Sequence, residues 1–321
     1  MIQVRDLVKR YGDFCAVDHL SFAVEEGEIL GFLGPNGAGK STTMNMITGY
    51  LSATEGDVII NGHNIYDEPE LAKRDIGYLP EIPPVYPDMR VKEYLSFAAE
   101  LKGLPRSGRK EAVAAVMEAV KITHMQDKLI KHLSKGYRQR TGLAQALLGD
   151  PKVIILDEPT VGLDPAQIIE MRELIRRLAK GHTVILSSHI LFEVNAVCDR
   201  ILIINHGKKV VIDTPEAIVS MLGGTEGVHL GVKASEEQAA GVLSSVPEVE
   251  HFAKEAEEEK KPSDPLVRFA VYAKPEADVR ESLFYAFAKA GYPIYEMRPI
   301  SRSLEEVFIA VTREEKDAGD L

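Results

Sequence analysis

The chain has 321 residues and 45% hydrophobic content, which is enough for one large domain and one smaller domain, each with its own core. Its formal net charge is −11, and the acidic excess is concentrated in residues 223–321, which argues against a nucleic-acid partner. No run of 18 apolar residues occurs and the first residues lack the apolar region of a signal peptide, so we expect a cytosolic protein.

The first 33 residues alternate like β-strands over 2–4 and 20–24, and turn residues separate these runs. They predict an antiparallel β element ahead of a buried strand at 29–33. Directly after that strand comes Gly34-Pro35-Asn36-Gly37-Ala38-Gly39-Lys40-Ser41, which fits the pattern Gly-x-x-x-x-Gly-Lys-Ser/Thr. A helix is expected to follow over residues 41–47, with Thr42 in its first turn.

A strand, a glycine-rich loop and a helix in this order predict a phosphate-binding loop. Glycines let backbone N–H groups turn toward a triphosphate, Lys40 reaches the β- and γ-phosphates, and the Ser41 hydroxyl can ligate Mg²⁺. The N-terminus of the helix adds the positive end of its dipole. We therefore expect a nucleotide with Mg²⁺, whereas an ordinary glycine turn would need neither the strand nor the helix.

Strands continue at 56–62 and 75–79, and then the pattern changes. Four prolines crowd residues 80–87, and residues 91–148 have helical periodicity without a convincing strand. Two apolar stripes mark these helices, and they are Val91, Tyr94, Leu95 and Ala98, then Val113, Val116, Met117 and Val120. We interpret residues 85–148 as a helical insertion in an α/β domain.

Continuous apolar runs return at 153–156, 183–186 and 201–204 and alternate with helices such as 166–179, which predicts a buried, mostly parallel sheet. The first of these runs leads into Asp157 and Glu158. Ligands of such sheets bind at the carboxyl ends of the strands. There Asp157 can hold the Mg²⁺ shell and Glu158 can polarise an attacking water.

The sequence Leu133-Ser134-Lys135-Gly136-Tyr137 opens a helix a short distance before the acidic strand. It resembles the Leu-Ser-Gly-Gly-Gln signature of ATP-binding-cassette (ABC) ATPases, with Lys and Tyr in place of one Gly and the Gln. Ser134 also suits the N-cap of that helix, a role that is compatible with the signature role.

The resemblance implies further site residues. Tyr11 is similar to the aromatic residue that stacks on adenine, with Val17 as its apolar neighbour, Asp164 resembles the D-loop residue, and His189 resembles the switch histidine that contacts the γ-phosphate. Alone, such a Tyr or His is usually a packed or satisfied polar residue, and the order of the motifs favours the site roles. Glu81 stands where the family has a glutamine, and its carboxylate could meet Mg²⁺ or the attacking water.

A boundary near residue 223 separates a cassette domain, 1–222, from an accessory domain, 223–321. The accessory domain has the predicted order of a ferredoxin-like α+β unit, with strands at 227–232, 249–254, 266–273 and 293–299 and helices at 236–245, 276–290 and 303–312. The charged run 255–262 reads as a solvated hairpin loop and 313–321 as a frayed tail.

By resemblance, the fold is an α/β P-loop NTPase cassette with a RecA-like, mostly parallel sheet, an antiparallel β subdomain and a helical subdomain. The resemblance implies an ATPase that serves as the ATP-binding subunit of an ABC exporter, at the cytoplasmic face of the membrane. Its partners would be a separate transmembrane permease, docked on residues 85–148, and a second ATP-binding subunit in a homo- or heterodimer. Ser134 and Gly136 of one subunit would then complete the site built on Lys40 of the other.

Two alternatives belong to other classes. A soluble ABC ATPase acting on ribosomes or DNA resembles fused cassettes with a basic linker or a cassette split by coiled coils, whereas this chain has one uninterrupted cassette and an acidic partner domain. A nucleotide sensor without turnover would not need the general base that Glu158 provides.

Overall fold

The computed structural model describes residues 1–223, 225–255, 266–274, 277–301, 304, 306, 308 and 309. The contacts within the chain divide it into two compact units, Met1–Pro215 and Glu216–Leu321. Helix α8 (Pro215–Gly223) groups with the second unit, whereas the boundary expected from the sequence lies at the end of this helix.

An antiparallel sheet opens the first unit, with the strand order β2-β1-β4-β5. A turn at Asn61 and Gly62, which have φ of 50° and 90°, joins β4 to β5, and Asn-Gly is the pair that such a left-handed hairpin turn favours. The strands are β1 (Ile2–Tyr11), β2 (Phe14–Val24), β4 (Glu55–Ile60) and β5 (His63–Asn64).

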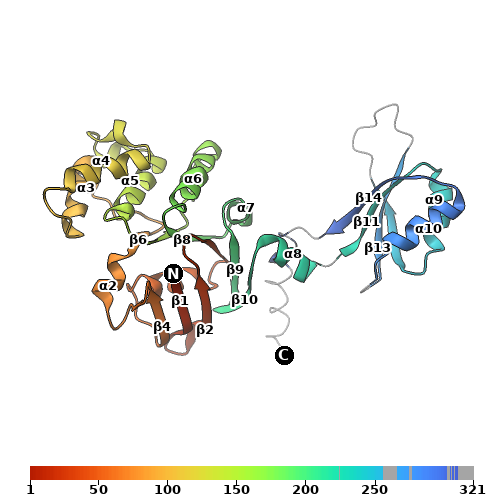
Figure 1. Ribbon diagram of the computed structural model, residues 1–321, viewed down its shortest axis with the longest axis horizontal. Coiled ribbons are helices and arrows are strands. Elements are labelled where there is room, and N and C mark those ends of the chain that lie inside the picture. Colours follow the sequence, from red (N-terminus) through yellow and green to blue (C-terminus); the bar gives the residue numbers. More distant parts are fainter. Residues whose placement is uncertain are drawn as a thin grey trace. The chain divides into compact units, whose positions relative to one another are not determined.

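A six-stranded sheet with the order β10-β9-β3-β8-β7-β6 forms the centre of this unit (Figure 1). All its pairings are parallel except that of β10, a strand that the sequence pattern did not predict, with β9. Parallel order places the carboxyl ends of five neighbouring strands at one edge. The strands are β3 (Ile29–Leu33), β6 (Ile76–Leu79), β7 (Val153–Asp157), β8 (Thr183–Ser188), β9 (Arg200–Asn205) and β10 (Lys208–Asp213).

One hydrophobic core joins the two sheets, because their buried side chains form a single cluster with those of α1 (Lys40–Ile47). The rings of Phe22 on β2 and Phe32 on β3 lie 5.8 Å apart in this cluster. Three further helices belong to the unit, α2 (Pro69–Arg74), α6 (Pro165–Leu178) and α7 (Leu191–Asn195). The core thereby fixes the strand that precedes the glycine-rich loop.

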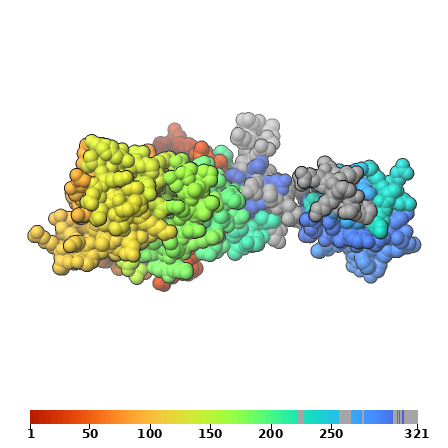
Figure 2. Space-filling view, turned by 90° about the horizontal axis from the view of Figure 1, so that it is seen from above, coloured from red at the N-terminus to blue at the C-terminus, as the bar shows by residue number. Residues whose placement is uncertain are grey.

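The predicted helical insertion consists of α3 (Val91–Leu101), α4 (Arg109–Ala119) and α5 (Lys135–Leu147), with short 3₁₀ turns at Thr123–Met125 and Ile130–His132. Both predicted apolar stripes are buried. At the start of α3, the Glu93 side chain accepts a hydrogen bond from the Arg90 N–H at 3.0 Å. Figure 2, seen from above, presents this helical subdomain in yellow as a continuous surface of the first unit.

The second unit contains a four-stranded antiparallel sheet with the order β12-β13-β11-β14, on which the helices α9 and α10 pack. Buried residues of α9 and α10, such as Leu243 and Phe287, pack with Val228 and Val271 of the sheet. This is the β-α-β-β-α-β unit that the sequence predicted. Its elements are β11 (Thr225–Val232), α9 (Glu236–Ser244), β12 (Val249–Lys254), β13 (Val267–Ala273), α10 (Arg280–Ala290) and β14 (Ile294–Ser301).

Three predictions for the second unit lie wholly or largely outside the described residues, namely the charged loop 255–262, the closing helix 303–312 and the tail 313–321. Within the described ranges, no helix combines the length and the hydropathy needed to cross a membrane.

Candidate active site

The carboxyl ends of four neighbouring strands bring together residues that are far apart in the sequence. The glycine-rich loop follows β3, Glu81 follows β6, Asp157 ends β7 with Glu158 next to it, and His189 follows β8. Because these strands are adjacent in the order β3-β8-β7-β6, all of these groups meet at one edge of the sheet.

The backbone of the glycine-rich loop needs glycine at two positions. Gly37 and Gly39 have φ of 84° and 101°, a conformation that other residues rarely adopt. A Cβ on Gly39 would also lie 2.5 Å from the carbonyl oxygen of Ala16. Helix α1 begins directly after Gly39, so the N–H groups of Ser41 and Thr42 lie in its first turn, where a helix attracts anions.

The Lys40 side chain folds back across this loop. Its Nζ donates to the carbonyl oxygens of Gly34 at 2.7 Å and Pro35 at 3.1 Å. Burial lowers the pKa of Lys40, while the charges of Glu158 and Asp157 raise it. The ammonium is thus held between loop carbonyls and two carboxylates, which is where a third source of negative charge, a phosphate, would be bound.

Asp157 is buried at the end of β7. The Ser187 hydroxyl donates to its Oδ1. Burial raises the pKa of Asp157, the Ser187 hydrogen bond lowers it, the charge of Glu81 raises it, and the charge of Lys40 and the nearby Ser41 hydroxyl lower it. The carboxylate therefore lies close to the loop hydroxyl that the sequence assigned to Mg²⁺.

Glu158 adopts a left-handed backbone conformation with φ of 49°, which is uncommon for a residue with a side chain. Its N–H donates to the backbone oxygen and the Oγ of Ser187, at 3.2 and 3.1 Å. The His189 Nδ1 lies 3.0 and 2.9 Å from its two carboxylate oxygens. Burial raises the pKa of Glu158, and the hydrogen bond and charge of His189 lower it. The sequence did not point to a role for Ser187, which stands two residues before the predicted histidine.

A cavity of about 560 Å³ opens over these groups. It includes predicted residues from the loop, both acidic segments and the switch histidine, and it adds Phe14, Ala16 and Val161, which the sequence reading missed. Val17, by contrast, is 1% exposed and packs in the core, so Phe14 and Ala16 are the neighbours of Tyr11 that face the cavity. The lining residues are Tyr11, Phe14, Ala16, Asn36, Gly37, Gly39, Lys40, Ser41, Thr42, Glu81, Glu158, Val161 and His189.

Ser134, Gly136 and Asp164 do not line this cavity. Ser134 is exposed and caps α5 by accepting from the Tyr137 N–H at 3.4 Å, as its sequence predicted. Asp164 caps α6 in the same way. Gly136 is buried, and a Cβ on it would lie 2.7 Å from the Gln167 side chain of its own chain. Ser134, Gly136 and Asp164 therefore lie at the N-termini of α5 and α6, outside the cavity.

Comparisons with known proteins agree with this geometry. The family described as ABC transporter matches residues 17–161. The chain is 37% identical to the uncharacterized ABC transporter ATP-binding protein YhcH of Bacillus subtilis, over 99% of this chain and 97% of that protein. It is 43% identical to the bacitracin transport ATP-binding protein BcrA of Bacillus licheniformis, over 65% and 68%. It is 35% identical to the Nod factor export ATP-binding protein I of Burkholderia orbicola, over 71% and 76%.

A solved structure described as the ATP-binding subunit of an ABC transporter has a TM-score of 0.63 and 31% identity, and it covers 69% of this chain and 92% of its own. The family match, at residues 17–161, includes the glycine-rich loop and the acidic strand. Fold, strand-end chemistry and sequence similarity agree, so the chain is an ATPase that belongs to the ATP-binding proteins of ABC transporters.

Proposed function

We propose that this protein is the ATP-hydrolysing subunit of an ABC exporter and that it works with a separate transmembrane permease at the cytoplasmic face of the membrane. The observation that carries this proposal is the meeting of Lys40, Asp157, Glu158 and His189 at one sheet edge, over a cavity of nucleotide size. The names of two relatives, for bacitracin transport and Nod factor export, support transport and favour export.

The nucleotide would bind with its phosphates in the glycine-rich loop. The Lys40 ammonium and the N–H groups of residues 34–42 would face the negative charge of the phosphates. Tyr11, which is half exposed at the rim of the cavity, would stack its ring on the base. Val17 would act from beneath, as the buried support of this rim. The loop residues Pro35, Asn36 and Ala38 shape the backbone that surrounds the phosphates.

The protein's own donors fit Mg²⁺. Ser41 and Asp157 would offer a hydroxyl and a carboxylate oxygen beside the loop, and Glu81 would add a second carboxylate to the same region. Mg²⁺ prefers oxygen and typically takes one or two protein ligands, with phosphates and water for the rest. When bound, the metal would offset the negative charge that develops on the phosphates.

Glu158 would act as the general base. Its raised pKa and its position at the cavity wall suit a carboxylate that accepts the proton of an attacking water. His189, whose side chain is 45% exposed, holds both oxygens of that carboxylate through Nδ1 and leaves its other ring nitrogen free to face the γ-phosphate.

A second ATP-binding subunit would complete the site. Ser134 is exposed and lies outside the cavity of its own chain, as do Gly136 and Asp164, so a role for them at a γ-phosphate requires a partner. The helix start at Ser134 offers N–H groups and a hydroxyl to an anion. Two subunits packed head to tail would thereby bury two nucleotides between them.

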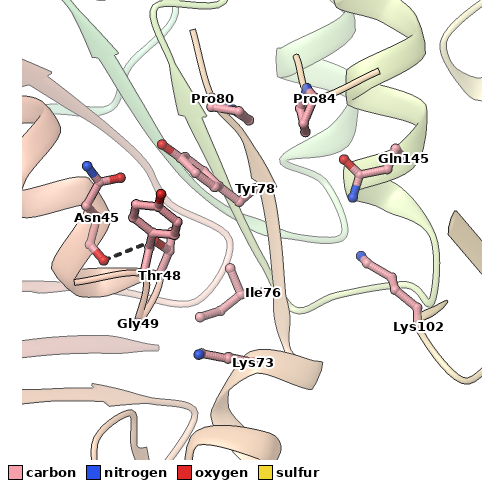
Figure 3. A pocket seen from close by; sticks show the side chains of 11 residues that line it. Asn45, Thr48, Gly49, Lys73, Ile76, Tyr78, Pro80, Pro84, Lys102 and Gln145 are labelled. Carbon is pink, nitrogen blue, oxygen red and sulfur yellow. Dashed lines mark hydrogen bonds between the residues drawn. The ribbon is translucent and has the colours of Figure 1, made fainter. Parts of the chain in front are cut away.

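The permease would dock in a second cleft of the first unit, of about 680 Å³ (Figure 3). Two lysines, Lys73 from α2 and Lys102 at the end of α3, line it, and its described lining has no acidic residue. Exposed apolar side chains such as Tyr50, also in the lining, and Leu101 supply a hydrophobic surface. This composition favours an amphipathic permease helix that carries a carboxylate. The lining residues are Asn45, Thr48, Gly49, Tyr50, Lys73, Ile76, Tyr78, Pro80, Pro84, Lys102 and Gln145.

Co-expression with a candidate permease tests the proposal. We expect the chain to sediment with membranes only when that permease is present, and the variant Lys73→Glu to remain in the supernatant. The matched charge reversal Lys110→Glu on the exposed surface of α4 should sediment like the wild type. Equal sedimentation of all forms would contradict docking at this cleft.

A further inference from the structure

A buried carboxylate, Glu193 on α7, lies next to the active site without lining its cavity. It is 4% exposed. One of its oxygens, Oε2, accepts hydrogen bonds from the Thr160 hydroxyl and from the Ser188 hydroxyl, the latter at 3.3 Å. Thr160 and Ser188 are buried as well. Nothing in the proposed hydrolysis uses this group of three side chains.

The two hydroxyls belong to the two segments that carry the proposed reacting groups. Thr160 stands two residues after Glu158, in the turn where the Val161 N–H donates to the Glu158 carbonyl at 3.2 Å. Ser188 directly precedes His189. Each hydroxyl can donate one hydrogen bond, and both donate to Glu193. The carboxylate thus accepts two hydrogen bonds and links the two segments.

Helix α7 gives this link a fixed base on the sheet. Val194, the neighbour of Glu193, is fully buried against β3. A Cβ on Gly31 of β3 would lie 2.1 Å from a methyl carbon of Val194, so the helix and the strand approach this closely only because residue 31 has no side chain. The same strand leads into the phosphate loop at Gly34. The anchor of Glu193 and the phosphate loop therefore share one rigid element.

We propose that Glu193 is a positioning residue for ATP hydrolysis. It ties the turn after Glu158 to the segment that carries His189 and thereby fixes the spacing of both groups above the phosphate loop. The inference rests on the proposed roles of Glu158 and His189. Glu193 itself touches no phosphate and takes no proton, so its removal should change turnover and leave nucleotide binding intact.

Steady-state kinetics of four full-length variants test this proposal. Glu193→Met and Thr160→Val keep much of the side-chain shape and break the link, because Met lacks the oxygen acceptor and Val lacks the donor. Each should lower kcat by roughly ten- to hundredfold, the size expected when reacting groups are misplaced by a fraction of an ångström to an ångström. The KM for ATP should stay within about threefold. Thr160→Ser keeps the donor and should restore kcat to within about threefold of the wild type. The double variant Glu193→Met, Thr160→Val should be no slower than the slower single variant, because both changes break the same link.

Glu28→Met is the matched control, because Glu28 is also buried and hydrogen-bonded, to the Glu25 N–H and to Arg200, but at the opposite end of β3. It should lower the melting temperature without lowering kcat. An unchanged kcat in Glu193→Met or Thr160→Val would overturn the proposal, and so would an equal loss in Thr160→Ser or in Glu28→Met. Glu158→Gln, measured alongside, distinguishes failure of the proposed general-base role of Glu158 from failure of the positioning role of Glu193. If Glu158→Gln hydrolyses ATP at the wild-type rate, the general-base role fails, whatever the Glu193 variants do.

Discussion

Glu158 combines three constraints that are rarely found at one residue, namely a left-handed backbone, burial, and a histidine on both carboxylate oxygens. Such backbone conformations persist only where the surroundings enforce them, and here the Ser187 side chain and backbone do so. The carboxylate is consequently presented to the cavity in one orientation. Burial raises its pKa, and His189 and the Lys40 ammonium offset part of that rise.

Replacing Glu158 by Gln should leave ATP binding intact and reduce hydrolysis by ~10²–10⁴-fold, since an amide cannot accept the proton of the attacking water. The measurement is steady-state phosphate release together with a nucleotide titration. Lys40→Ala serves as the contrasting variant, because removal of its charge should weaken binding itself. Phosphate release near the wild-type rate in Glu158→Gln would remove Glu158 from its assigned role.

Glu81 differs from the family pattern in its charge, and the structure places it on the wall of the cavity, where its charge raises the pKa of Asp157. Glu81→Gln should therefore retain ATPase activity and change its dependence on Mg²⁺, because only the carboxylate adds negative charge near the metal ligands. Titration of the rate with Mg²⁺ at fixed ATP checks this. Superimposable curves for both forms would rule out a role of Glu81 near the metal.

Among the elements, α7 shows how a single glycine sets the packing on which the site depends. The Gly31 position on β3 is filled by Val194 and Cys198, which lie 2.1 and 2.9 Å from the site of a Cβ. Gly31→Ala should therefore displace α7 and cost roughly 1 to 3 kcal/mol of the unfolding free energy, the usual penalty for overpacking a core.

Thermal unfolding measures this cost, with Gly181→Ala as the control. A Cβ on Gly181 meets nothing within 4 Å, and its φ lies outside the left-handed region, so this substitution should leave the melting temperature almost unchanged. Equal melting temperatures for Gly31→Ala and the wild type would show that the contact between α7 and β3 is not tight.

Much of the fold could be predicted from the sequence, because continuous apolar runs indicate buried strands and apolar stripes indicate the buried faces of helices. Strand β10 was missed, since two lysines begin it and only three apolar residues follow before Asp213, and α7, with five residues, is too short to display a periodicity. The motifs located Lys40 and Asp157, but Ser187 and Glu193 act through contacts across β7 and β8, and no local pattern encodes such a contact.

For the whole molecule, the division into two units has a direct consequence. Every residue that lines the candidate nucleotide cavity lies in Met1–Pro215. A protein truncated after residue 222 should therefore bind ATP with an affinity within about threefold of the full chain, and a nucleotide titration on folded protein checks this. A folded 1–222 fragment that does not bind nucleotide would show that the second unit contributes to the site.

The composite site predicts that ATP drives dimerisation. The best probe of the partner contact is Ser134→Asp, because Asp also caps helices and so preserves the start of α5 while it places a negative charge on an exposed position. Gly136→Asp, which the sequence alone would suggest, is less clean, since its side chain also collides with Gln167 of the same chain.

Light scattering of the Glu158→Gln protein, in which bound ATP persists, measures this dimerisation directly. The molar mass should change from monomer to dimer when Mg-ATP is added and should stay at the monomer value with Mg-ADP. Addition of Ser134→Asp should abolish the shift and leave ATP binding by the monomer intact. A dimer that forms equally well without ATP, or that persists in the Ser134→Asp variant, would contradict a nucleotide site shared between two subunits.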